Sequence, residues 1–196
     1  DGNLALLANG TLVPWGSYRY PEPGGRYAIP KALSNVVAIA EGDPNTFNLA
    51  LRSGGDVVAW SPDGQVNTKF KTFLADDLAN GVGIANNGGY GLALHPDGTV
   101  VGWGWQGSQP AVPRGLSNAV AVACGNYYSQ HFLALRADGT VVEWNHDGSI
   151  RSGVSSTLSD VVSIAATGDL SLALRANGRV VAWGTFGLET NLPPDL

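Results

Sequence analysis

The hydrophobic positions of the chain form one short pattern that occurs five times. Each copy begins with an apolar Leu-Ala-Leu segment and reaches a tryptophan eleven positions later, as in residues 92–103, LALHPDGTVVGW. In the middle stands Asn-Gly, Gly-Gly or Asp-Gly, which tolerates the positive φ angles of a tight hairpin turn. We therefore expect two antiparallel strands, B and C, in repeats that start near Leu4, Leu49, Leu92, Leu133 and Leu172.

A third apolar segment precedes four of the five hairpins. It reads VVAIAEG from Val36, GVGIANN from Gly81, AVAVACG from Ala119 and VVSIAAT from Val161. β-Branched residues alternating with alanine or glycine are typical of a strand packed closely on both faces, which we name strand A. A fourth strand, D, is expected between each tryptophan and the next strand A. As an edge strand it should be short and poorly patterned.

The repeat spacing predicts a β-propeller. The starts of successive copies lie 45, 43, 41 and 39 residues apart, and about four strands per repeat match propeller blades. We expect an all-β domain over residues 1–196, with about four to five four-stranded antiparallel blades. Five hairpins against four A strands indicate part of a larger propeller, or one completed by association of chains, with an unusual small propeller as the alternative.

The same residues resemble a known family. A strand of the form VxxIAxG followed by LALxxDGxVxxWG is similar to the repeat of the regulator of chromosome condensation family. The likeness is closer to its bacterial seven-bladed members, of the type of beta-lactamase inhibitor protein II. Ser61 and Asn145 depart from the pattern, because they replace the glycine that follows the tryptophan. The resemblance implies blades that bind another protein, but it names no partner, since family members bind very different ones.

Composition and charge narrow the classes of partner. Hydrophobic residues make up 44% and charged residues 14% of the chain, which excludes a disordered chain and a coiled coil. The net charge is −5 and the 11 basic residues are scattered, so we expect no nucleic-acid partner. No run approaches the roughly 18 apolar residues of a membrane span, so we expect no membrane insertion.

Catalytic and metal-binding signals are weak. His95, His131 and His146 lie in different repeats and have no metal-ligand spacing with each other or with Cys124. No nucleophile–base pair or carboxylate pair stands out, so we expect no enzyme activity, no metal and no cofactor. Cys124 ends a strand A and is expected to be a small, semi-buried thiol. The five repeated tryptophans, one per blade, are expected to be core residues.

The length of the connections indicates where a partner would bind. In an up-and-down blade the A–B and C–D connections share one face, and all variation in length lies outside the constant B–C hairpin. Function in loops should therefore reside on that variable face. We predict that it binds another protein, with self-association or flanking domains also possible as partners. The predicted partner-binding residues are Tyr18, Tyr20, Trp105, Tyr127, Tyr128 and Phe186, whose large rigid side chains are typical of interface hot spots.

Two alternatives are kept open at this stage. The chain could be a structural or self-assembling propeller segment of a larger extracellular bacterial protein, because open sheet edges invite pairing. It could also be a carbohydrate-binding module that uses exposed aromatic side chains. Either alternative, like the protein-binding scaffold, suits a secreted or cell-surface protein.

Overall fold

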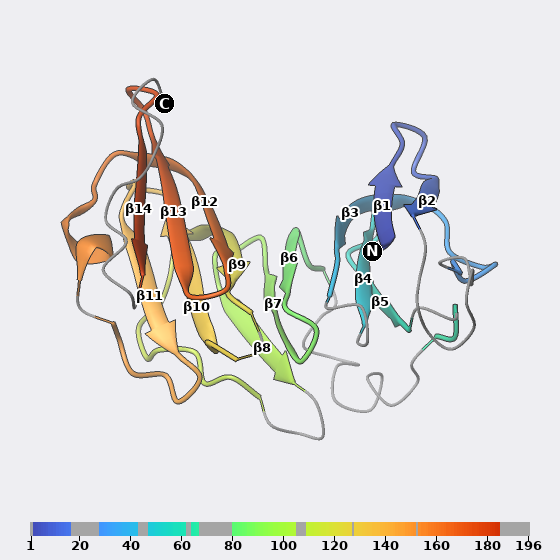
Figure 1. Cartoon of the computed structure of the whole chain (residues 1–196), viewed down its shortest axis with the longest axis horizontal. Coiled ribbons are helices and arrows are strands. Elements are labelled where there is room, and N and C mark those ends of the chain that lie inside the picture. The colour runs from blue at the N-terminus through green and yellow to red at the C-terminus, as the bar shows by residue number, and fades with distance from the viewer. Residues whose placement is uncertain are drawn as a thin grey trace.

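The computed structural model describes residues 2–16, 28–42, 47–61, 64–66, 80–104, 109–126, 128–151 and 153–184. In these ranges the chain is all-β, with five small antiparallel sheets in chain order and one short 3-10 helix, η2 (Val154–Thr157). The first and last sheets lie on opposite sides of the view in Figure 1, with the others between them. The sheets are β-propeller blades, as the repeat pattern predicts, and are numbered 1 to 5.

Every blade is built on the predicted B–C hairpin. Blades 2 to 5 add an A strand, which pairs with the free side of strand B, and blade 1 has strands B and C alone among the described residues. The A strands are β3 (Val36–Ala40), β6 (Gly83–Asn86), β9 (Ala119–Cys124) and β12 (Val161–Thr167). The B strands are β1 (Gly2–Leu6), β4 (Asn48–Arg52), β7 (Tyr90–Leu94), β10 (His131–Arg136) and β13 (Leu170–Arg175). The C strands are β2 (Leu12–Gly16), β5 (Val57–Trp60), β8 (Val100–Gly104), β11 (Val141–Asn145) and β14 (Val180–Gly184).

The five hairpin turns share one geometry. In blade 1 the amide of Gly10 donates to the carbonyl of Leu7 at 2.9 Å, and the amide of Leu7 donates to the carbonyl of Thr11 at 2.8 Å. Only the glycine has a positive φ, +78° at Gly10, so this is a type I turn closed by a glycine bulge. Asn9 contributes in another way, because its Oδ1 accepts the amide of Thr11 at 3.0 Å. The expected positive φ is therefore confirmed for the glycine and wrong for the residue before it.

Ser61 and Asn145, which replace the glycine after the repeated tryptophan, each begin a second turn of the same kind. In blade 4 the amide of Gly148 donates to the carbonyl of Asn145 at 2.9 Å, and the φ of Gly148 is +82°. The chain then returns to the blade through a single bridge between Trp144 and Ile150. The expected fourth strand is thus reduced to one bridge in the described part of this blade. Blade 2 repeats the arrangement with Ser61, Gly64, Trp60 and Val66.

Adjacent blades pack through one repeated contact. Successive side chains of a strand point to opposite faces, so the two leucines of each strand B face the next blade and the alanine between them faces the previous one. In blade 4, Leu133 and Leu135 lie in one apolar cluster with Ala173 and Trp183 of blade 5. The other three junctions use Leu92, Leu94, Ala134 and Trp144, then Leu49, Ala93 and Trp103, and finally Leu4, Ala50 and Trp60.

The repeated tryptophans are core residues in four blades and exposed in one. Trp60 and Trp144 are fully buried, and Trp103 and Trp183 are nearly so. Trp15 of blade 1 is 52% exposed, so the core assignment is wrong for this position. The reason is positional, because no blade precedes blade 1 among the described residues to cover its tryptophan.

Candidate functional site

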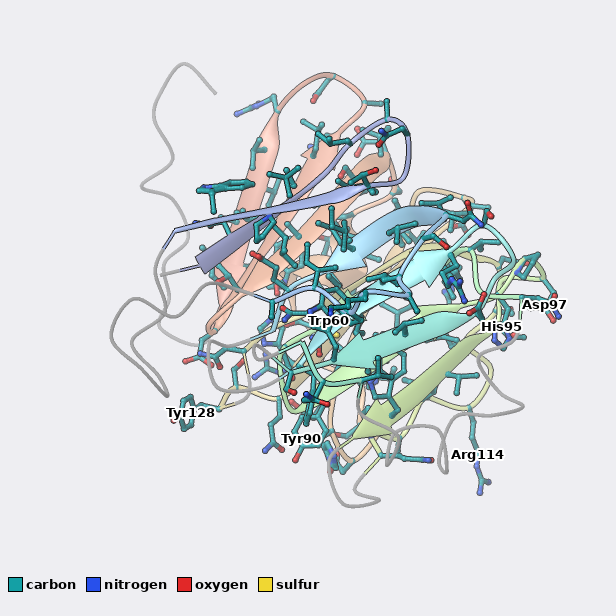
Figure 2. All side chains as sticks on the ribbon, turned by 90° about the vertical axis from the view of Figure 1, so that its right-hand side faces the viewer. Trp60, Tyr90, His95, Asp97, Arg114 and Tyr128 are labelled. Carbon is teal, nitrogen blue, oxygen red and sulfur yellow. The ribbon has the colours of Figure 1, made fainter. Side chains whose placement is uncertain are left out.

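The loops of the blades are divided between two opposite faces. The A–B loops and C–D turns form one face, which we call the loop face, and the B–C turns lie on the other, the turn face. Figure 2 places Tyr128 of the loop face on the opposite side of the molecule from His95 and Asp97, which belong to a B–C turn. The loop face includes, among the described residues, 87–89, 125–126, 128–130, 145–149 and 168–169.

Contacts between blades make the loop face a continuous surface. The rings of Tyr90 in blade 3 and His146 in blade 4 are 4.6 Å apart between centroids, at an angle of 59°. The amide of Asn126 in blade 4 donates to the carbonyl of Gly168 in blade 5 at 3.3 Å. Asn86 Nδ2 of blade 3 donates to the Phe47 carbonyl of blade 2 at 2.6 Å. Loops of blades 2 to 5 are therefore held against one another.

The A–B loop of blade 4 presents an aromatic side chain from a fixed backbone. Tyr128 is 85% exposed. Asn126 Oδ1 accepts the amides of Tyr128 at 3.1 Å and Ser129 at 2.8 Å, which closes the loop on itself. The Ser129 hydroxyl donates to the carbonyl of Gly168 at 2.5 Å, which ties the loop to blade 5. An exposed tyrosine on a backbone held in this way needs little ordering when it binds.

Of the six predicted partner-binding residues, the structure places one. Tyr128 lies on the loop face and is exposed, as the prediction requires. The other five, Tyr18, Tyr20, Trp105, Tyr127 and Phe186, lie outside the described residues. Whether they join Tyr128 in one surface therefore stays a prediction.

A buried polar chain lies under the Tyr128 loop, and it centres on His131. The His131 ring is fully buried, with Nδ1 at 3.0 Å from Ser129 Oγ and Nε2 at 3.1 Å from Ser171 Oγ. Because the Ser129 hydrogen is directed at Gly168, we assign the ring hydrogen to Nδ1 and the hydrogen of Ser171 to the Nε2 contact. Burial lowers the pKa of His131, and the smaller opposing effect of Glu143 does not reverse this. The ring is therefore neutral at neutral pH.

Glu143 continues this chain between blades 4 and 5. Its carboxylate is 4% exposed and accepts the indole N–H of Trp183 at 2.7 Å through Oε2. Oε1 lies 3.1 Å from the guanidinium of Arg151 and 3.4 Å from the hydroxyl of Ser171. A buried carboxylate is tolerated only when it is paired and hydrogen bonded, and here both conditions are met. Glu143 thus fixes the tryptophan of one blade to the sheet of the previous one.

We expect His131 to make the protein less stable in mild acid. An unfolded histidine has a pKa near 6.5, and the folded pKa of His131 lies below its usual value. The unfolded state therefore binds more protons as the pH falls below about 6.5, so stability declines from there toward the folded pKa. The slope contributed by this one proton approaches about 1.4 kcal/mol per pH unit.

Urea unfolding of the wild type and His131→Phe from about pH 8 to about pH 5 checks this contribution. Phenylalanine is the residue at the matching position of blade 2, Phe47, which is also buried. The free energy of unfolding of the wild type should fall relative to that of His131→Phe as the pH falls. A difference that stays constant over the whole range would contradict the assignment.

The thiol and the possible metal ligands of the described residues form no reactive site. Cys124 is buried, more deeply than the semi-buried thiol that we expect from the sequence, and burial raises the pKa of its thiol far above the usual value. In the described ranges no group of three or more His, Cys, Asp and Glu side chains could hold a metal ion. No helix in the same ranges is long and apolar enough to cross a membrane.

Sequence reasoning missed the polar chain that supports the loop face. Its members Ser129, Ser171, Glu143 and Arg151 stand in different segments, so their contacts depend on how two blades pack. One signal was available. Glu143 is a charged residue at a strand C position where the other repeats carry Pro, Ala, Gly and Ala, so a buried acceptor could have been suspected.

No protein-family model matches the chain, and no curated protein matches it. Solved structures do match. The entire ectodomain of the Physcomitrella patens receptor kinase CR4 has a TM-score of 0.66 at 19% identity over 98% of this chain and 52% of that chain. Yeast RCC1 (Prp20), solved with Kap60, has 0.63 at 20% identity over 99% and 56%. Human WBSCR16 has 0.61 at 19% identity over 84% and 51%.

The chain spans about half the length of these three proteins. At such identities the likeness establishes the fold alone, and that fold is a β-propeller of the type found in RCC1. The expected resemblance is thus confirmed at the level of repeat architecture. The finer expectation of a bacterial, beta-lactamase-inhibitor-like type has no support from these structures.

Proposed function

We propose that this chain is a non-catalytic protein-binding scaffold whose partner contacts the loop face around Tyr128. The observation that carries the proposal is an aromatic side chain, 85% exposed, on a loop fixed by Asn126 and Ser129. A side chain of this size on a preorganised backbone loses little entropy on binding, and tyrosine is enriched among hot spots.

The polar chain beneath the loop supports this role. Ser129 bonds both to the carbonyl of Gly168 and to the buried ring of His131, so the loop rests on the junction of blades 4 and 5. The remaining predicted residues belong to the connections of the same face by sequence, and we propose that they extend the surface. They are Tyr18, Tyr20, Trp105, Tyr127 and Phe186.

Relatives in fold give a precedent for protein partners. Yeast Prp20 has been solved bound to Kap60, and its binding to Gsp1p and histones has been described. We do not carry these partners over, because identities near 20% establish only the common fold. What we carry over is the class of function, a propeller that binds another protein.

Site-specific photo-crosslinking in the source cells tests the location. A photoreactive phenylalanine analogue is placed at position 128 of the loop face or at Arg114, an exposed residue that Figure 2 shows far from Tyr128. We expect one protein to be crosslinked from position 128 and not from position 114. Equal crosslinking from both positions, or none from position 128, would remove the loop face as the binding surface.

Tyr128→Ala should weaken binding of the crosslinked partner by at least about 2 kcal/mol, or about 30-fold. Arg114→Ala is the matched control and should leave the affinity unchanged. Titration calorimetry with both purified variants measures the difference, and thermal unfolding verifies that each remains folded. An affinity of Tyr128→Ala within a factor of two of the wild type would refute the hot spot.

A further inference from the structure

The Tyr128 loop, whose described residues are 125, 126 and 128–130, closes directly over the ring of His131. The amide of Gly125 donates to the His131 carbonyl at 2.8 Å. A Cβ added to Gly125 would overlap Nδ1 and Cε1 of the ring, so the backbone of the loop lies against the ring and leaves no space for water between them. His131 has no exposed surface. Water can therefore reach the ring from the loop face only when the loop lifts.

Polar contacts hold the loop in this closed position. The carbonyl of Gly168 in blade 5 accepts the amide of Asn126 at 3.3 Å and the hydroxyl of Ser129 at 2.5 Å. The same hydroxyl lies 3.0 Å from Nδ1 of His131. Gln130, which joins the loop to β10, has a φ of +46°, a conformation that residues other than glycine rarely adopt. The closed loop thus depends on contacts with the ring and with blade 5, and it constrains its own backbone.

A proton on the ring changes these contacts. In the neutral ring Nε2 accepts from the Ser171 hydroxyl at 3.1 Å, whereas a protonated Nε2 must donate. Ser171 would then turn its hydrogen toward Oε1 of Glu143, at the long distance of 3.4 Å. Charged groups act on the ring from three sides: burial, the largest effect, and Arg151 lower the pKa of His131, while Glu143 and Asp169 raise it. The net direction is downward, so the closed loop disfavours the charged ring.

We propose that protonation of His131 opens the Tyr128 loop, so that mild acid releases Tyr128 from its fixed position on the loop face. The open loop admits water, which solvates the imidazolium, whereas the closed loop excludes it. The open form therefore binds the proton more tightly, and its population rises as the pH falls below about 6.5. The rise approaches about tenfold per pH unit until the pH reaches the folded pKa. Weaker binding at the loop face in acid is a consequence that rests on the proposed function, whereas the opening itself does not.

Hydrogen exchange of single amides, followed by NMR on the whole chain without a partner, tests the opening. The amides of Gly125 and Asn126 report on the loop, because they donate to the carbonyls of His131 and Gly168 outside it. The amide of Ala134, in the centre of the middle strand of blade 4, reports on the blade itself. Protection factors, which correct for the effect of pH on intrinsic exchange, are compared between about pH 7.5 and about pH 5.5.

Two variants serve as controls because neither has a titrating group at this position. His131→Phe introduces the residue that is buried at the matching position of blade 2, Phe47. His131→Gln keeps a donor for the Ser129 hydroxyl. Thermal unfolding at both pH values verifies that each variant is folded.

We expect the protection of Gly125 and Asn126 in the wild type to fall by about tenfold over this range, while Ala134 stays protected. In both variants the protection of the loop amides should not change with pH. Constant loop protection in the wild type, or an equal loss in the variants, would overturn the proposal. A parallel loss at Ala134 would also overturn it, since the blade would then unfold as a whole. Because no partner is present, this result is independent of whether position 128 crosslinks to one.

Discussion

Trp103→Ala will lower the free energy of unfolding by about 3–5 kcal/mol, whereas Trp15→Ala will lower it by less than about 1 kcal/mol. The two residues occupy the same position of their repeats. Trp103 is 2% exposed between blades 2 and 3, so its removal leaves a cavity and loses contacts on both sides. Trp15 is 52% exposed, so water replaces much of what the alanine removes.

Urea unfolding of the two variants and the wild type measures both changes. The packing around Trp103 leaves little freedom to compensate. A Cβ on Gly91, the cross-strand partner of Trp103, would fall within 2.1–2.8 Å of the indole. Equal effects of the two substitutions would show that the blades do not pack by the repeated contact.

Glu143→Ala will lower the free energy of unfolding by about 2–4 kcal/mol. The loss has two sources, because the indole N–H of Trp183 loses its acceptor inside the protein and the side chain leaves a void. Arg151 is 27% exposed and can turn its guanidinium toward water, which limits the cost of its unpaired charge. Loss of the carboxylate should also loosen the junction of blades 4 and 5, on which the Tyr128 loop rests.

Glu143→Gln is the matched variant for this effect. The amide oxygen can still accept from Trp183, so this substitution should cost less than the alanine by at least about 1 kcal/mol. Urea unfolding of both variants at neutral pH gives the two values. If both substitutions cost under about 0.5 kcal/mol, the buried carboxylate does not hold the blades together.

The repeat pattern is enough to predict the strands. A constant distance of eleven residues from leucine to tryptophan fixes the length of the hairpin, and the Leu-Ala-Leu alternation fixes which side chains share a face. The turn type could not be derived with the same certainty. Asn-Gly and Asp-Gly suit both a two-residue turn and a type I turn with a glycine bulge, and the five identical pairs of backbone hydrogen bonds decide for the latter.

The surroundings of each repeated residue depend on which blades lie next to it. The repeat pattern in the sequence does not give this information. Trp15 occupies the same position of its repeat as Trp60, yet among the described residues only Trp60 has a preceding blade packed on it. Ser61 and Asn145 depart from the Trp-Gly pattern of the repeat, and each begins a further turn with a positive-φ glycine. The Ser-Pro-Asp-Gly and Asn-His-Asp-Gly segments carry the Asp-Gly pair that is typical of such a turn.

The sequence is enough to predict which face of the blades carries the candidate site. It is not enough to predict the contacts that hold the Tyr128 loop in place. Strand order alone places Tyr128 on the variable face, and the structure agrees. The anchoring of its loop needs Asn126, Ser129, Gly168 and His131 to meet, and Gly168 stands 39 positions from Ser129 in another blade. Such contacts depend on blade packing, which local sequence patterns do not specify.

Labelling with 5-fluorotryptophan tests most directly that Trp60, Trp103 and Trp144 are packed between blades while Trp15 is exposed to solvent. Single Trp→Phe substitutions assign the fluorine resonances, and the shift on replacing H2O by D2O reports exposure of each indole to solvent. In dilute solution the resonance of Trp15 should shift, while those of Trp60, Trp103 and Trp144 should not. A Trp15 resonance insensitive to solvent, or solvent-sensitive resonances from the other three, would contradict the account.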